Sequence, residues 1–112
     1  MSELTIKQAQ EDVEKFLEEW GKKLKRVDNH FYIFTHLTEE TGELARDIIN
    51  AEFNLSTDRR KPSKKKETIA RIEDDLGDVL FHLLELANAY GIDLATAFKE
   101  AITSKHIKRF GT

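Results

Sequence analysis

The sequence contains no cysteine, one proline and five glycines among 112 residues. Without cysteine the chain cannot form a disulfide, a thiolate zinc site or a thiol nucleophile, and this composition fits a reducing compartment. No apolar run approaches the roughly 20 residues that span a bilayer, and the polar opening residues lack the apolar segment of a secretory signal. We therefore expect a cytoplasmic protein without a membrane segment.

Neither sign of charge dominates the chain. It has 18 Lys and Arg against 21 Asp and Glu, which gives a formal net charge of -3. There is thus no global basic field of the kind that attracts nucleic acid, and we do not expect a nucleic-acid partner. The length is sufficient for one folded unit with its own core, so residues 1–112 are predicted to form a single domain with a compact core.

The scarcity of helix breakers leaves room for long helices. Every long segment places apolar residues three and four apart rather than in alternation. We predict an all-α fold, a bundle of four to five helices. Asp93 is the expected N-cap of the last helix, and Gly91 is expected to end the helix before it. The first three helices are expected over about residues 6–25, 31–53 and 67–90. The residues expected to face inward are Val13, Phe16, Leu17, Trp20, Leu24, Ile33, Leu37, Leu44, Ile48, Ala51, Ile69, Ile72, Leu76, Val79, Leu80, Leu83 and Ala87.

A basic segment separates the second and third predicted helices. Residues 56–66 contain the only proline and most of the local turn formers, which predicts a loop. One interpretation of this loop is a solvated connector, and the alternative is a lid that attracts phosphate. It has no aromatic side chain, which disfavours binding of single-stranded nucleic acid. Its basic residues are Arg59, Arg60, Lys61, Lys64, Lys65 and Lys66.

Acidic residues concentrate in two short windows, LTEETGELARD and IEDDLGD, which hold eight of the 21 in the chain. At about 100° per residue, Glu40, Glu43 and Asp47 share one edge of the second helix beside its apolar stripe. Asp75 and Asp78 share one edge of the third helix in the same way. If the two helices form an antiparallel hairpin, both edges lie roughly 12 to 20 Å from the loop, at the same height.

Carboxylates at one level on facing helices repel one another unless a positive charge lies between them. A donor set made only of oxygens favours Mg²⁺ or Mn²⁺ over Zn²⁺, and Mg²⁺ commonly works with substrate phosphates. The alternative is that both windows are merely exposed polar faces. Gly42 and Gly77 weaken that alternative, because a glycine inside a helix costs about 1 kcal/mol relative to alanine and indicates close approach of the backbone, either to a partner helix or near the site.

These windows, with the LANAYGIDL that follows, resemble the MazG-like branch of the all-α nucleoside triphosphate pyrophosphohydrolases. The motif of that family is EExxE followed, after a connector, by ExxD. The resemblance covers about residues 31–110, with a longer connector than usual and Asp at position 75 where the family usually has Glu. The matching residues are Glu39, Glu40, Glu43, Asp75 and Asp78.

The resemblance implies an activity and roles for these residues. The reaction would be hydrolysis of a nucleoside or deoxynucleoside triphosphate between the α- and β-phosphates, giving the monophosphate and pyrophosphate. Glu40, Glu43, Asp75 and Asp78 would bind Mg²⁺, with Mn²⁺ as a possible substitute. Glu39 would position the attacking water or support the ligands.

Candidate substrate-binding residues lie outside the acidic windows. The C-terminal segment resembles the basic tail of the family, and the resemblance implies that Lys105 and Arg109 approach the phosphates. Basic residues are equally favoured at a helix C-terminus by its dipole. Trp20 is a candidate for stacking on the base, and the alternative is that it packs in the core.

The sequence leaves two other functions open. One is a phosphoribosyl-ATP pyrophosphohydrolase, a relative with similar acidic helices, and the other is a non-catalytic helical module whose acidic edges bind a basic partner. Phe81 and Leu84 lie outside the main stripe of their helix, which predicts apolar surface that a second copy covers. The family typically forms dimers or tetramers, so we expect a homodimer or homotetramer.

Overall fold

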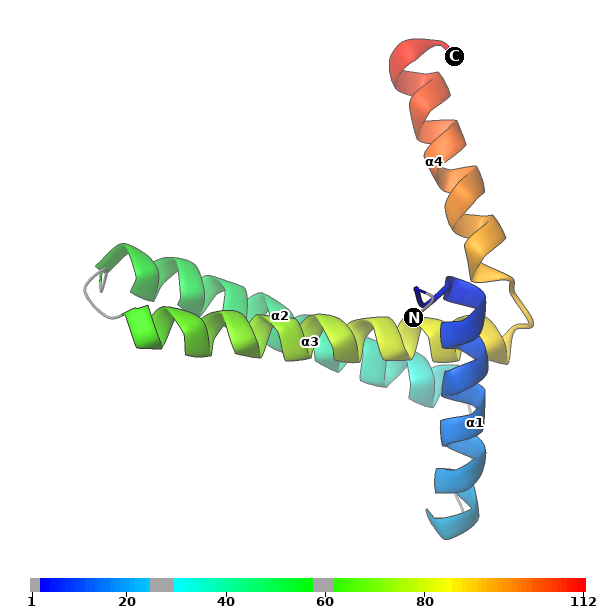
Figure 1. The fold of residues 1–112 in the computed structure, drawn as a ribbon, viewed down its shortest axis with the longest axis horizontal. Coiled ribbons are helices and arrows are strands. Elements are labelled where there is room, and N and C mark those ends of the chain that lie inside the picture. Colours follow the sequence, from blue (N-terminus) through cyan, green and yellow to red (C-terminus); the bar gives the residue numbers. More distant parts are fainter. Residues whose placement is uncertain (1–2, 25–29, 58–61) are drawn as a thin grey trace. The chain divides into compact units, whose positions relative to one another are not determined.

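The computed structural model describes residues 3–24, 30–57 and 62–112 (Figure 1). These residues form four helices, and none of the described residues lies in a β-strand, so the predicted all-α class is confirmed. Within the described chain, no helix combines the length and apolar character needed to cross a membrane. The helices are α1 (Ile6–Leu24), α2 (His30–Thr57), α3 (Pro62–Ala89) and α4 (Leu94–Phe110).

Side chains cap the first and last helices. At the start of α1, the Thr5 amide donates to Gln8 Oε1 at 3.0 Å and the Gln8 amide donates to Thr5 Oγ1 at 3.1 Å. This reciprocal pair is a capping box. At the start of α4, Asp93 accepts hydrogen bonds from the amide and the hydroxyl of Thr96 at 3.4 and 2.9 Å. The predicted N-cap at Asp93 is confirmed.

The turn between α3 and α4 depends on Gly91, as expected. Gly91 has a φ of +66°, which side-chain-bearing residues rarely adopt. Its amide donates to the Asn88 carbonyl at 3.0 Å, and the Ile92 amide donates to the Ala87 carbonyl at 2.8 Å. These two bonds are those of a Schellman motif, which satisfies the last carbonyls of a helix while the chain turns away from its axis.

The predicted loop over residues 56–66 is wrong at both ends. Helix α2 continues through Thr57, and α3 begins at Pro62. Proline suits the first helical position because its missing N–H would have no intrahelical partner there. The remaining residues of the predicted loop, 58–61, lie outside the described residues, and with them Arg59, Arg60 and Lys61.

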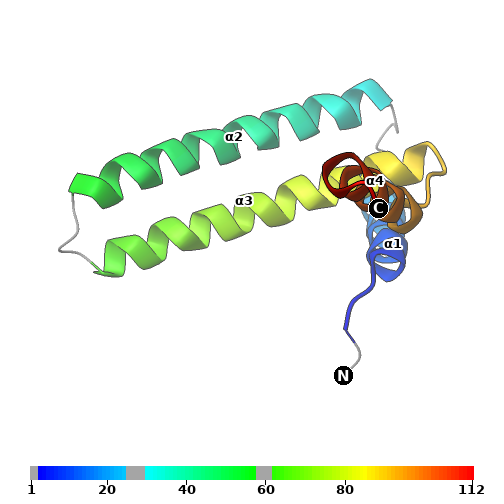
Figure 2. The same ribbon diagram turned by 90° about the horizontal axis from the view of Figure 1, so that it is seen from above.

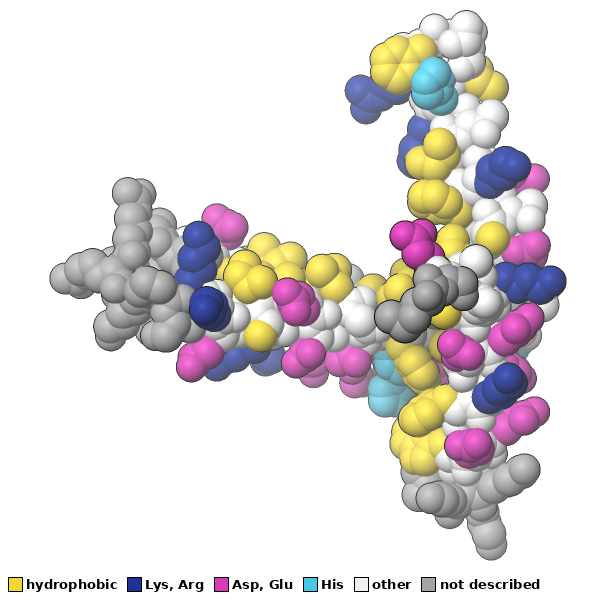
Figure 3. Space-filling model, in the orientation of Figure 1, with side chains coloured by type: hydrophobic (Ala, Val, Ile, Leu, Met, Phe, Trp, Pro, Cys, Tyr) yellow, Lys and Arg dark blue, Asp and Glu magenta, His cyan; other side chains and the backbone are white. Residues whose placement is uncertain are grey.

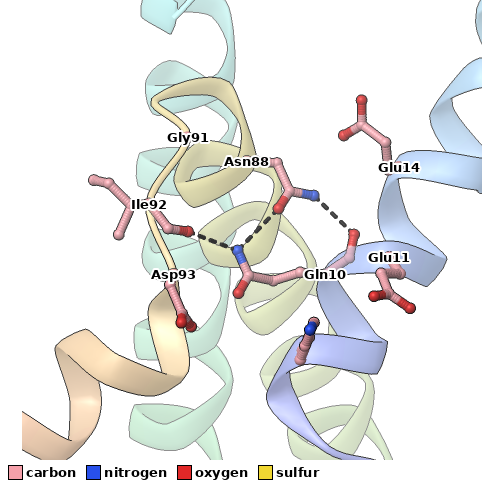
Figure 4. Close-up of a pocket in the computed structure, with 8 residues that line it drawn as sticks. Gln10, Glu11, Glu14, Asn88, Gly91, Ile92 and Asp93 are labelled. Carbon is pink, nitrogen blue, oxygen red and sulfur yellow. Dashed lines mark hydrogen bonds between the residues drawn. The ribbon is translucent and has the colours of Figure 1, made fainter.

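The chain consists of two compact units, Met1–Asp28 with Leu84–Thr112, and Asn29–Leu83. In the first unit Gln10 ties α1 to the turn after α3 (Figure 4). Its Nε2 donates to Asn88 Oδ1 and to the Ile92 carbonyl, both at 2.9 Å, and its Oε1 accepts from the Leu94 amide at 3.1 Å. Asn88 Nδ2 donates in return to the Gln10 carbonyl at 2.8 Å. These bonds satisfy both amide side chains and border an open pocket.

The second unit is a hairpin in which α2 and the first part of α3 run side by side in both ribbon views (Figures 1 and 2). Ile33 and Ala51 of α2 are buried in the described structure, and so is Asp75 of α3. Both polar and apolar side chains lie on the face where α2 and α3 meet, and most of them are only partly buried. The half-buried residues on it are His36, Leu37, Glu40, Leu44 and Asp47 of α2, and Thr68, Ile72, Val79 and His82 of α3.

The face of α3 expected to point inward is confirmed only in part, since Ile72 and Val79 are half-buried and Ala87 is buried. Leu76, Leu80 and Leu83 are 53%, 51% and 41% exposed, whereas Leu84, expected on the surface, is 4% exposed. Phe81, also expected on the surface, is half-buried. The cause is that α3 carries apolar residues on two sides. The side containing Asp75 and Val79 faces inward, and the leucine-rich side does not.

The predicted compact core is also wrong for the single chain. The buried hydrophobic residues of the described structure are few, and most of them are small. Expected core residues such as Phe16, Trp20 and Ile48 are 52%, 40% and 41% exposed. On the face drawn in Figure 3, hydrophobic side chains lie at the surface of each of the coloured helical segments. The buried hydrophobic residues are Val13, Ile33, Ala51, Leu84 and Ala87.

The two glycines inside the acidic windows do not mark a close approach within the chain. A Cβ placed on Gly42 or on Gly77 meets no atom within 4 Å. The expectation that another backbone comes near these positions is therefore wrong for the described structure.

Candidate functional site

The acidic residues predicted as cation ligands gather between α2 and α3 in the second unit. Glu40 is half-buried, and the charges of Glu43 and Asp78 act on it. Asp75 is 8% exposed, and the charges of Glu43 and Asp78 act on it as well. Glu43 and Asp78 themselves are exposed. The hairpin thus brings together the four residues from its two helices, with a buried or half-buried carboxyl on each.

Burial and like charges shift the ionisation of Glu40. Partial burial is the main cause that raises the pKa of Glu40, and the charges of Glu43 and Asp78 add to it. The imidazole of His82 acts in the opposite direction. The electrostatic surroundings of Glu40 therefore disfavour its ionised form, and a positive charge beside it would reverse that preference.

Asp75 is perturbed more strongly, and its main partner is a residue that is not part of the EExxE and ExxD motif. A hydrogen bond with the Asp47 side chain, burial, and the charges of Asp47, Glu43 and Asp78 raise the pKa of Asp75 to about 6. Asp47 lies one helical turn after Glu43 and is half-buried. Sequence reasoning placed Asp47 on the acidic edge but did not include it among the ligands, although its spacing from Glu43 was a signal.

Two buried carboxylate oxygens of this cluster, Glu40 Oε2 and Asp75 Oδ2, have no hydrogen-bond partner in the part of the chain that the structure describes. Buried polar atoms are nearly always satisfied in folded proteins, so water or a cation could be the partner of these two oxygens. A hard cation is the partner that suits carboxylate oxygens. Among the described residues, no three His, Asp or Glu side chains are already arranged around one point as a metal site. The donor chemistry fits a cation, and the side chains do not form a finished cage.

Two histidines lie beside the cluster. The rings of His36 and His82 stack across the hairpin with centroids 5.6 Å apart and an angle of 21°. Tyr32 packs edge-on against His36 at 4.4 Å. His36 is one turn before Glu40, and His82 is one turn after Asp78. The pair therefore packs α2 against α3 at the edge of the acidic cluster.

The other predicted site residues occupy different surroundings. Glu39 is exposed on α2, next to Glu40. Trp20, 40% exposed, belongs to α1 of the first unit, where its ring lies 5.9 Å from that of Phe16. Lys105 and Arg109 are exposed on α4, which has no buried residue. Arg109 is in the last turn of that helix, where the dipole favours a cation. The role of these residues in binding substrate stays a prediction.

Comparisons with known proteins point to one family. The family model described as the MazG nucleotide pyrophosphohydrolase domain matches residues 29–110, which include the whole hairpin and its acidic cluster. The chain is 35% identical over 97 residues to the uncharacterized protein YpjD of Bacillus subtilis (strain 168), covering 87% of this chain and 79% of that protein. It is 32% identical over 100 residues to the uncharacterized protein YvdC of the same organism, covering 88% and 93%. No solved structure matches it at comparable significance.

Proposed function

Since this chain belongs to the MazG nucleotide pyrophosphohydrolase domain family, we propose that it hydrolyses nucleoside or deoxynucleoside triphosphates to the monophosphate and pyrophosphate in a reaction that requires Mg²⁺. The observation that supports this most directly is the hairpin cluster. Its carboxyls come from both motif segments, and two of its buried oxygens, Glu40 Oε2 and Asp75 Oδ2, have no hydrogen-bond partner among the described residues.

Glu40, Glu43, Asp75 and Asp78 would hold the cation, and Mn²⁺ would be accepted as well because it shares the preference for oxygen. When bound, the cation neutralises phosphate charge and lowers the pKa of a coordinated water. Because the described side chains do not form a finished cage, binding requires them to reorient. A positive charge between the carboxylates would remove their mutual repulsion, and this would favour the reorientation of the side chains.

The remaining roles belong to side chains of this chain acting directly on the substrate or on water. Glu39, exposed beside Glu40, would orient the water that attacks phosphorus. Lys105 and Arg109 would bind phosphate oxygens, and Trp20 would stack on the base. No covalent nucleophile is needed for this reaction.

We also propose that the chain acts as a homodimer or homotetramer. The leucines of α3 that were expected inside, Leu76, Leu80 and Leu83, are at least 41% exposed. Exposed apolar side chains in this number indicate a surface that another chain covers. The proposal of self-association therefore rests on these exposed leucines. It no longer rests on Phe81 and Leu84, which are half-buried and buried.

The proposed function is tested by incubating the chain with a panel of nucleoside and deoxynucleoside triphosphates in Mg²⁺ and in EDTA, and by identifying the products. We expect monophosphate and pyrophosphate, released only with the cation. Release of diphosphate and inorganic phosphate would contradict the proposal. Turnover of phosphoribosyl-ATP alone would instead identify the related pyrophosphohydrolase. A folded chain inactive on all substrates would favour a non-catalytic interaction module.

A further inference from the structure

Aromatic rings lie on the hairpin directly beyond the acidic cluster. In an inference that rests on the proposed function, we propose that Tyr32 and His36 of α2 form the surface on which the base of the nucleotide stacks. His82 of α3 holds the His36 ring in place. The contacts among these rings, their exposure and their height along the hairpin carry the inference.

The rings form one continuous row that passes from α2 to α3. Tyr32 packs edge-on against His36 with centroids 4.4 Å apart, and His36 stacks on His82 at 5.6 Å and 21°. Phe81 packs edge-on against His82 at 5.3 Å. His36 is therefore in contact with a ring from its own helix and a ring from the other helix. These contacts restrain its orientation before a ligand arrives.

The row is accessible from outside. Tyr32 is 47% exposed, and His36 and His82 are half-buried. A cluster that served only to pack two helices together would be expected to bury its rings and to be apolar. Partly exposed Tyr and His rings are, in contrast, the kind of surface on which proteins stack unpaired bases.

The row also lies at the height that a bound nucleotide requires. The contact between His36 and His82 sets the register of the antiparallel hairpin. Glu40 and Asp78, each four residues closer to the connection between the helices, therefore lie level with one another. His36 is one turn from Glu40, about 6 Å along the axis, and Tyr32 is two turns away, about 12 Å. With the phosphates at the acidic cluster, the base of an extended nucleotide reaches this part of α2.

The row belongs to the same compact unit as the acidic cluster, whereas Trp20, the stacking candidate from the sequence, belongs to the other unit. Stacking on Tyr32 and His36 therefore needs no side chain from the first unit. Every base has a π-face, so such a surface favours a ligand with a base over one without, and discriminates little among the bases.

The test compares ligands with and without a base, bound to the full chain in Mg²⁺. Isothermal titration calorimetry gives the affinities of inorganic tripolyphosphate and of the α,β-methylene analogues of the common deoxynucleoside triphosphates, which cannot be hydrolysed at that bond. We expect Tyr32→Leu and His36→Leu each to weaken binding of the tightest analogue by about tenfold and to leave tripolyphosphate binding within about twofold.

Two further variants are the controls. Tyr32→Phe keeps the ring and should bind the analogue within about twofold of the wild type. Tyr90→Leu makes the same change at the other tyrosine of the chain, which is 59% exposed and belongs to the first unit, and it should bind both ligands as the wild type does.

Tripolyphosphate separates a stacking surface from a contact that only holds the helices together. If the row only packed α2 against α3, Tyr32→Leu would disturb the acidic cluster and weaken tripolyphosphate and analogue binding equally, which would overturn the inference. Unchanged analogue binding in either leucine variant would overturn it as well. Neither result affects the proposed function if the wild type releases pyrophosphate. A wild type that releases none from any triphosphate would contradict the proposed function itself.

Discussion

Individual carboxyls in the hairpin are held in surroundings that disfavour their charge. Asp75 is the clearest example, since it is almost fully buried and the acidic side chains near it, Asp47 first among them, raise its pKa. Such an arrangement destabilises the cation-free fold, and natural proteins keep arrangements of this kind mainly at functional sites. The cost to stability and the proposed activity therefore arise from the same residues.

The stability of the cation-free chain should depend on pH through Asp75. Its pKa rises from 3.8 to about 6 on folding, so the folded chain binds more protons than the unfolded chain between these values. Stability from this group then falls as pH rises from about 4 to about 6. Urea unfolding in EDTA at a series of pH values measures this. Asp75→Asn should lose that part of the pH dependence, and an unchanged profile would contradict the assignment.

Asp93 should show the opposite pH dependence. Hydrogen bonds from the side chain and the amide of Thr96 lower the pKa of Asp93, so the folded chain favours its ionised form. The stabilisation is present above the ordinary pKa of the group and is lost as pH falls through its folded value. Asp93→Ala should reduce stability at neutral pH and have less effect at pH 2, as seen in the helical circular dichroism signal during unfolding. An equal loss at both pH values would contradict the role of the ionised cap.

Among the elements, the helices and their caps were the features that the sequence predicted best. Gly91 and Asp93 act through bonds to residues within six positions, and local patterns report such bonds well. The orientation of α3 was not predictable in the same way. Its apolar residues occupy two sides, and periodicity alone cannot decide which side meets α2. When the leucine-rich side of α3 was taken as the inward side, the acidic residues were expected at the edge of the core. In the structure Asp75 is buried instead.

The glycines of the acidic windows should be replaceable as far as this chain is concerned. Nothing lies within 4 Å of a Cβ built on Gly42 or Gly77, so alanine fits without strain. Each substitution to alanine should raise the free energy of unfolding by about 0.5 to 1 kcal/mol, because alanine is the better helix former. Urea unfolding monitored by circular dichroism measures the change. A loss of stability or of oligomer would show instead that another backbone approaches these glycines in the assembled protein.

For the whole molecule, the sequence identified the family and the residues of its motif. It did not predict which apolar side chains are exposed at the surface. The motif residues are close in sequence within each helix, and their meeting follows from hairpin pairing. Because α3 has apolar residues on two sides, the local sequence does not indicate which side is covered. This is why Leu84 was expected outside and Leu80 inside, the reverse of what is observed.

Self-association should depend on the leucine-rich face of α3. Leu80→Glu places a charge on a residue that is 51% exposed, so it should leave the single chain folded while preventing another chain from covering this face. Arg71→Glu, exposed on the opposite side of the same helix at about 180°, is the control. Light scattering after size-exclusion chromatography gives the mass of each. An unchanged oligomer in Leu80→Glu would exclude this face as the interface.

The most direct measurement of the central claim is the rate of Mg²⁺-dependent pyrophosphate release by Glu43→Gln and Asp78→Asn, one from each motif segment. Glu73→Gln, an exposed acidic residue of α3, serves as the control. We expect both motif variants to lose at least about a hundredfold in rate at unchanged helical content, and the control to keep its activity. Pyrophosphate release that survives in either motif variant, or that falls equally in the control, would contradict the assignment of the acidic hairpin as the catalytic site.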